Sequence, residues 1–196
     1  MIVKDVIISA LKILGRNELA AALIQGSALS AEDNETVETL LYCFNATEDE
    51  VARNYVPLTS CEMFTSVTDK FLLFLFKHPP VRVVRVVSEG EEIPFEVYSD
   101  HVYAHAFQVY IDYEYAPAKK ELTDFGSFGD EVSENVLVYG TVAEYCLING
   151  EIEAADTWES KYRQAVDMVQ QRLASTKKAG ADKLHSGGYI PPRRWV

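Results

Sequence analysis

Histidine and carboxylate side chains in the stretch DHVYAH form the sharpest candidate for chemistry in this chain of 196 residues. His101 and His105 are four positions apart and would face the same side of a regular strand. Asp100 and Asp112 could add oxygen ligands for a metal ion. Two same-face residues at this spacing nevertheless lie about 13 Å apart on a strand, which is too far to share one ion. We therefore expect no metal site here and assign the two histidines to a surface or an interface.

The motifs of several enzyme classes do not occur in the sequence. It contains no glycine-rich phosphate loop of the G-x-G-x-x-G or G-x-x-x-x-G-K type, and no G-x-S-x-G nucleophile turn. Acidic runs at 48–50, 89–92 and 151–153 lie at expected helix starts or turns, where solvated carboxylates are the simpler interpretation. We expect a protein that is not an enzyme and that needs no cofactor.

Three cysteines, Cys43, Cys61 and Cys146, are an odd number without the spacing of a metal site. We expect all three to be reduced and buried. Nothing in the sequence singles out one of them with one of the four histidines as a catalytic pair. Nucleophilic cysteine chemistry is therefore disfavoured.

Charge is distributed unevenly along the chain. The net charge is −12, of which residues 1–175 carry −16 and residues 176–196 carry +4. The acidic balance argues against general affinity for nucleic acid, because binding phosphates requires clustered lysine and arginine. The apolar runs are shorter than the roughly 20 residues that span a bilayer, so we expect no membrane association.

Helical periodicity dominates the first part of the chain. Apolar residues recur at helical spacing from Val6 to Leu14, before Gly15, and a second short helix is predicted in RNELAAALIQG, with Asn17 as a possible N-cap and Gly26 as its end. A longer helix is predicted from Ser30, a suitable N-cap, to a point before Pro57.

Strand-like sequence follows from Cys61 to about Pro117. The segment is rich in β-branched and aromatic residues, and in 107–114 the apolar residues alternate with polar ones. We predict four or five antiparallel strands with turns at Glu89-Gly90 and near Asp100. The apolar side of the alternating strand is expected to carry Phe107, Val109, Ile111 and Tyr113.

Helix returns in the last part of the chain. Two antiparallel helices joined at Asn149-Gly150 are expected to pack as a hairpin and to end near Ser175. We place four of their side chains in the core of the helical bundle: Tyr145, Leu147, Trp158 and Tyr162.

The order helices, strands, helices indicates an α+β fold. Residues 1–58 supply the N-terminal helices of the bundle, 59–118 a β-rich insertion, and 119–175 the helical hairpin that completes the bundle. Residues 176–196 are rich in glycine, proline and basic side chains and are expected to form a flexible C-terminal arm.

The chain resembles the head-to-tail adaptor, or connector, proteins of tailed bacteriophages. The closing hairpin carries the resemblance, with its Ala-Glu-Tyr at 143–145, its glycine turn, and Trp158 and Tyr162 on the last helix. The opening segment MIVKDVIISALKILG, the long acidic helix and the final PPRRWV are also similar to this family.

The resemblance implies a structural protein of the virion neck, made in the host cytoplasm. Such adaptors assemble, typically as twelve copies, into a ring below the portal protein, and DNA passes through that ring to the tail or nozzle proteins without being specifically bound. An acidic lining would repel phosphate. The resemblance also implies that the C-terminal arm docks on the portal or on a neighbouring copy, through Tyr189, Ile190, Pro191, Pro192, Arg193, Arg194 and Trp195.

Two alternatives stay open from the sequence. One is another ring component of the same neck or tail, either a stopper or a tail-completion protein. The other is an unrelated intracellular enzyme or binding module with its site in the β-rich insertion. The adaptor interpretation is the one we carry forward.

Overall fold

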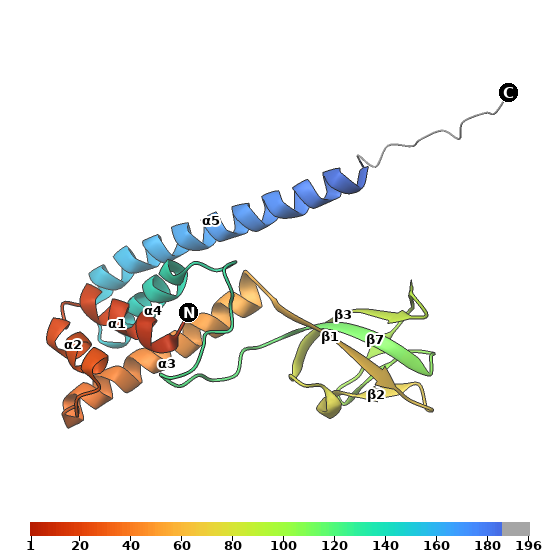
Figure 1. The fold of residues 1–196 in the computed structure, drawn as a ribbon, viewed down its shortest axis with the longest axis horizontal. Coiled ribbons are helices and arrows are strands. Elements are labelled where there is room, and N and C mark those ends of the chain that lie inside the picture. The colour runs from red at the N-terminus through yellow and green to blue at the C-terminus, as the bar shows by residue number, and fades with distance from the viewer. Residues whose placement is uncertain (186–196) are drawn as a thin grey trace.

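The fold is α+β, with helices at both ends of the chain and antiparallel sheets between them (Figure 1). The computed structural model describes residues 1–185, and for 176–185 only the backbone. The N-terminal helices are α1 (Val3–Ile13), α2 (Asn17–Gln25) and α3 (Ala31–Asn54), and the C-terminal helices are α4 (Glu134–Ile148) and α5 (Ile152–His185).

Helix α4 is the centre of the helical bundle, because α1, α3 and α5 all pack against it. Its buried residues follow one another from Val136 to Cys146 with few interruptions. A helix that is apolar on every side is surrounded by other elements. The bundle is therefore built from both ends of the chain.

Helix α3 begins and ends as its sequence predicts. The Ser30 hydroxyl accepts a hydrogen bond from the Asp33 backbone N–H at 3.1 Å, which satisfies one of the free donors of the first turn. The helix ends at Asn54, three residues before Pro57.

Seven strands and one 3-10 turn form two small sheets between α3 and α4, which we call the β insertion. The four-stranded sheet has the order β1-β7-β3-β4 and the three-stranded sheet the order β2-β6-β5. Their bounds are β1 (Leu58–Thr65), β2 (Lys70–Leu72), η1 (Leu73–Leu75), β3 (Pro80–Ser88), β4 (Glu91–Glu92), β5 (Glu96–Val97), β6 (His101–Tyr103) and β7 (Gln108–Tyr115). The prediction of four or five strands was too low, because β4 and β5 are only two residues long and carry no detectable alternation.

The β insertion has a core of its own. Val109, Ile111 and Tyr113 of β7 are buried as the alternation predicts, and they pack with Phe71 and Val102 of the smaller sheet. Phe107 precedes β7 and is exposed, so its predicted place on the apolar side was wrong. The Glu89-Gly90 turn between β3 and β4 is confirmed, and both residues have positive φ, 53° and 86°.

The return from the insertion to the bundle runs through residues 116–133, which lie along α3 and the start of α1 (Figure 1). The Val3 N–H donates to the Asp124 carbonyl and the Lys4 N–H to the Leu122 carbonyl, both at 3.0 Å. The Asn45 side chain of α3 accepts from the Lys120 N–H at 2.6 Å and donates to the Lys120 carbonyl at 3.1 Å. This segment therefore links α1 to α3.

Helix α5 is longer than predicted. It continues past Ser175 to His185, so the first part of the expected flexible arm is helical. In Figure 1 its C-terminal half extends beyond the N-terminal end of α4. Glycine at position 180 favours an earlier end of the helix, which is why the sequence placed the boundary too early.

Candidate interaction surfaces

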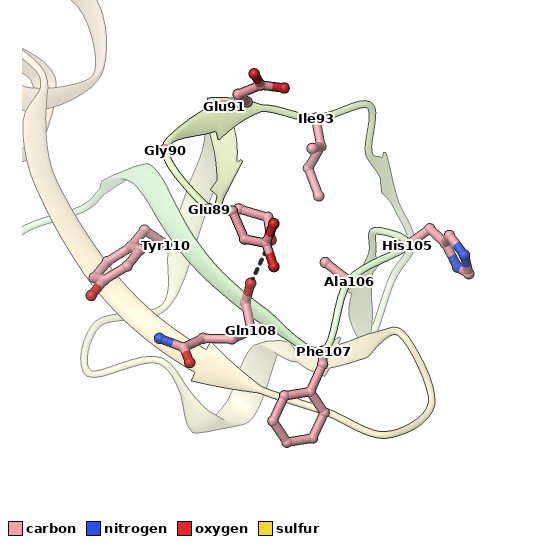
Figure 2. A pocket seen from close by; sticks show the side chains of 10 residues that line it. Glu89, Gly90, Glu91, Ile93, His105, Ala106, Phe107, Gln108 and Tyr110 are labelled. Atoms are coloured by element: carbon pink, nitrogen blue, oxygen red, sulfur yellow. Dashed lines mark hydrogen bonds between the residues drawn. The ribbon is translucent and has the colours of Figure 1, made fainter.

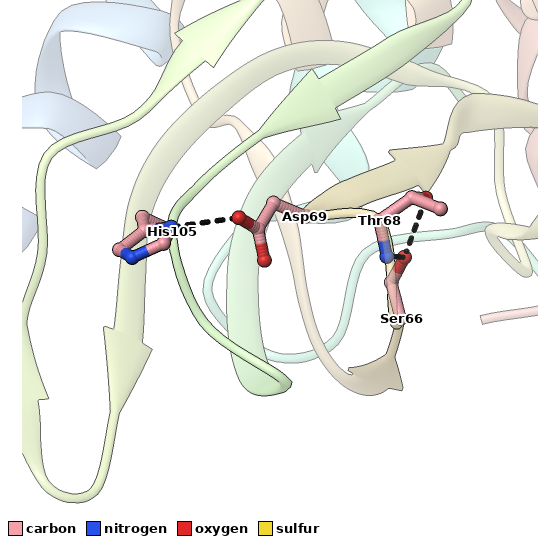
Figure 3. A network of polar contacts seen from close by, with 4 residues as sticks. All are labelled: Ser66, Thr68, Asp69 and His105. Atoms are coloured by element: carbon pink, nitrogen blue, oxygen red, sulfur yellow. Dashed lines mark hydrogen bonds and ion pairs between the residues drawn. The ribbon is translucent and has the colours of Figure 1, made fainter.

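The two histidines considered for a metal site contact different carboxylates. His101 Nδ1 lies 2.7 Å from Asp100 Oδ1, and its ring stacks on Tyr98. His105 lies beyond the end of β6, and its Nδ1 is 2.7 Å from Asp69 Oδ2 (Figure 3). Within residues 1–175, whose side chains the structure describes, no group of three or more His, Cys, Asp or Glu residues is arranged to hold a metal ion.

The Asp69–His105 pair belongs to a contact between two connections of the insertion (Figure 3). The Ala104 N–H donates to the Asp69 carbonyl at 3.1 Å, and the Thr68 N–H donates to the Ser66 hydroxyl at 3.2 Å. The turn between β1 and β2 is thereby fixed to the end of β6. Asp69 precedes β2 and His105 follows β6, so these contacts extend the pairing of these two strands of the smaller sheet and give His105 a structural partner.

The cysteines differ in burial but share a raised pKa. Cys43 and Cys146 are buried as predicted, whereas Cys61 is exposed on β1, so that part of the prediction was wrong. Burial, with a smaller contribution from Glu144, raises the pKa of Cys43 to about 12. A hydrogen bond to Asp112, followed by burial, raises the pKa of Cys61. Thiols in these surroundings are protonated at neutral pH and are poor nucleophiles.

Glu48 is the buried carboxylate of the bundle. Its Oε1 accepts a hydrogen bond from the Ser127 N–H at 2.6 Å, while its Oε2 is buried and has no hydrogen-bond partner among the described residues. Burial raises the pKa of Glu48. The acidic run 48–50, predicted to be solvated, therefore contains one residue that anchors the 116–133 segment on α3.

The four side chains predicted for the bundle core divide into three cases. Tyr162 and Tyr145 are buried as predicted. Trp158 is half-buried, packs on Tyr139 with 5.6 Å between ring centroids, and lies beneath Lys161. Leu147 is 53% exposed, so its core assignment was wrong. It lies in the last turn of α4, where the neighbouring helices no longer cover every side.

A hollow of about 750 Å³ lies at the tip of the insertion, between the β3–β4 turn and residues 105–108 (Figure 2). Glu89, Ile93 and Ala106 point into it, whereas His105 and Glu91 point away. Catalytic acid and base groups must converge on one reacting atom. The polar groups of this hollow diverge, so it is not arranged as a catalytic centre.

Two grooves on the helical bundle combine exposed apolar side chains with charge of one sign. The first, which we call the α4–α5 groove, is lined by Ser133, Asn135, Tyr139, Lys161, Gln164, Ala165, Met168, Val169 and Arg172. The second, which we call the α3 groove, is lined by Glu35, Glu38, Thr39, Tyr42 and Ile148. The sequence did not single out these grooves, because Tyr42 and Met168 lie off the apolar stripes of their helices and only the packed bundle brings their neighbours beside them.

The residues that the sequence assigned to docking, Tyr189, Ile190, Pro191, Pro192, Arg193, Arg194 and Trp195, lie outside the described residues. No helix in the described part of the chain combines the length and the apolar character needed to cross a membrane. Comparison with protein-family models and with curated proteins finds no match for this chain.

Proposed function

We propose that this chain is a structural virion protein of the head-to-tail adaptor type, which forms a ring below the portal and lets DNA pass to the tail. The observation that carries the proposal is the architecture: a bundle closed by an α4–α5 hairpin, a β insertion with its own core, and an α5 that runs past the bundle. This arrangement supports the resemblance of the sequence to adaptors, because three of the resembling segments, the opening helix, the long helix α3 and the closing hairpin, pack together in one bundle.

The chemistry of the described residues supports a structural role over catalysis. The cysteine thiols are held protonated, the two candidate histidines contact separate carboxylates, and the groups around the insertion hollow diverge. Cys43 and Cys146 are packed in the core, and the two histidines each contact a carboxylate within the insertion. The acidic balance of the chain suits a ring that DNA must slide through, since carboxylates repel phosphate.

The proposal gives the C-terminal residues a task. Residues 186–196 follow directly on α5 and contain two prolines, two arginines and a tryptophan. Proline reduces the entropy lost on docking, and arginine and tryptophan are frequent anchors of protein interfaces. In our proposal this segment grips the portal protein.

The test is cosedimentation with the portal ring of the same phage. A variant ending at His185 keeps every described element, so it should fold like the full chain. We expect the full chain to sediment with the portal and the shortened chain to stay behind. If both chains bound the portal equally, residues 186–196 would not be the segment that binds it. Binding to tail proteins in place of the portal would instead favour a stopper or tail-completion protein.

A further inference from the structure

Two apolar grooves of opposite charge lie on the same bundle. No carboxylate lines the α4–α5 groove, which has the bases Lys161 and Arg172, although residues 1–175 carry a net charge of −16. No base lines the α3 groove, which has the carboxylates Glu35 and Glu38. Surfaces of opposite charge steer partners together and exclude wrong ones.

Each groove exposes large apolar side chains to solvent. Met168 is 71% exposed in the α4–α5 groove, and in the α3 groove Tyr42 is 67% and Ile148 52% exposed. Methionine and aromatic side chains are enriched in the buried parts of protein interfaces. Each groove therefore combines an apolar centre with a charged rim, as docking surfaces do.

The grooves lie on opposite flanks of α4. Tyr139 lines the α4–α5 groove and Ile148 lines the α3 groove. These two residues are about two and a half turns apart on a helix of about 3.6 residues per turn, so they point in opposite directions. One chain consequently presents complementary surfaces on two sides, and neither groove can fill the other within the same copy.

The acidic residue of α4 that is closest in sequence to the lining of the α4–α5 groove contacts α1. Glu134 lies between Ser133 and Asn135, but its carboxylate accepts a hydrogen bond from Ser9 of α1 at 3.4 Å. Lys161 lies 3.8 Å from the centroid of the Trp158 ring and is exposed. It is therefore placed at the rim of the groove, within reach of an incoming acidic surface.

We propose that the α4–α5 groove of one copy docks on the α3 groove of the next copy, with Lys161 facing Glu35 and Glu38 and Met168 packing on Tyr42 and Ile148. A contact between two different surfaces leaves one of each free, so it continues into a ring when the rotation closes. This contact joins neighbouring copies of the proposed ring, so the inference rests on the proposed function.

Exchanging the charges on the two sides tests the contact. Sedimentation velocity, up to millimolar protein concentration at physiological salt, measures self-association. Lys161→Glu or Glu38→Lys alone should weaken self-association at least about tenfold, because like charges then meet. The two changes in one chain should restore it. Lys70→Glu and Glu91→Lys, matched changes on the β insertion, should leave it unaltered. A wild-type chain that stays monomeric, or a double variant that fails to recover, overturns the inference.

A mixing experiment tests the head-to-tail geometry. Met168→Asp spoils one groove and Tyr42→Asp the other, so neither variant should associate alone. Mixed together, they should form dimers and nothing larger, because each pair keeps one intact contact. Absence of mixed dimers contradicts the inference. Cosedimentation of the same variants with the portal distinguishes the groove contact from the adaptor function. If the single variants still form a ring on the portal, the groove contact is refuted and the adaptor proposal stands.

Discussion

Gly140 of α4 lies directly against Thr47 of α3, at the point where these helices meet α5. A Cβ atom built at position 140 would lie 2.3 Å from Thr47 Cγ2 and 3.1 Å from Tyr162 Cε2. Thr47 is buried, and its hydroxyl donates to the Cys43 carbonyl at 2.9 Å, so it has little room to move. The three long helices can approach this closely only because position 140 carries no side chain.

The first prediction concerns this contact. Gly140→Ala should lower the free energy of unfolding by about 1–3 kcal/mol through overpacking, even though alanine is intrinsically the better helix former. Thr47→Ser in the same chain removes Cγ2 and should recover much of the loss. Urea unfolding at neutral pH measures both variants. Equal stability of Gly140→Ala and wild type would show that the helices can separate at no cost.

Glu48 gives a prediction for pH dependence. Because burial raises its pKa, the folded state binds the proton more tightly than the unfolded chain does. The resulting stability is fully present below the unfolded pKa of about 4.3 and is lost as pH rises through the folded value. Glu48→Gln should therefore gain stability relative to wild type as pH rises from about 4 toward neutrality. A difference in unfolding free energy that is constant over this range contradicts the account of Glu48.

Tyr162 and Trp158 lie one turn apart on α5 but differ in burial. Tyr162 is 2% exposed, so Tyr162→Ala should cost about 3–5 kcal/mol of unfolding free energy. Trp158 is half-buried, and Trp158→Ala should cost clearly less. Thermal and urea unfolding of the two variants, measured side by side, check the order. A reversed order would mean that the packing of α5 on α4 differs from that described.

The separate core of the β insertion predicts a local effect. Ile111→Ala should remove hydrogen-exchange protection from the strands β1, β3 and β7 while leaving α4 protected, because Ile111 packs only within the insertion core. Tyr110→Ala is a matched control, since Tyr110 lies next to it on the exposed face of the same strand. Loss of protection throughout the bundle would show that the two cores unfold as one.

The elements were predictable where the sequence repeats a pattern. Ser30 with its acidic first turn specified the start of α3, and alternation specified the buried side of β7. Leu147 could not be placed, because α4 is apolar on every side and its periodicity does not distinguish the covered face from the exposed one. Cys61 was misplaced because its surroundings depend on strand register, which pairs it with Asp112 from a distant part of the chain.

The candidate surfaces were less predictable than the fold. The α3 groove joins Tyr42 to Ile148, and the α4–α5 groove joins Tyr139 to Met168, so each depends on how two helices pack. Periodicity in the sequence predicts which residues of one helix are on its apolar face. It does not predict which residues of another helix lie beside them. The grooves therefore became visible only in the folded bundle.

Electron microscopy of the portal ring mixed with this protein tests the central claim most directly. We expect a closed ring of added density, coaxial with the portal, that disappears when the chain ends at His185. Portal rings without added density at saturating protein, or density attached at scattered positions without rotational symmetry, would contradict it.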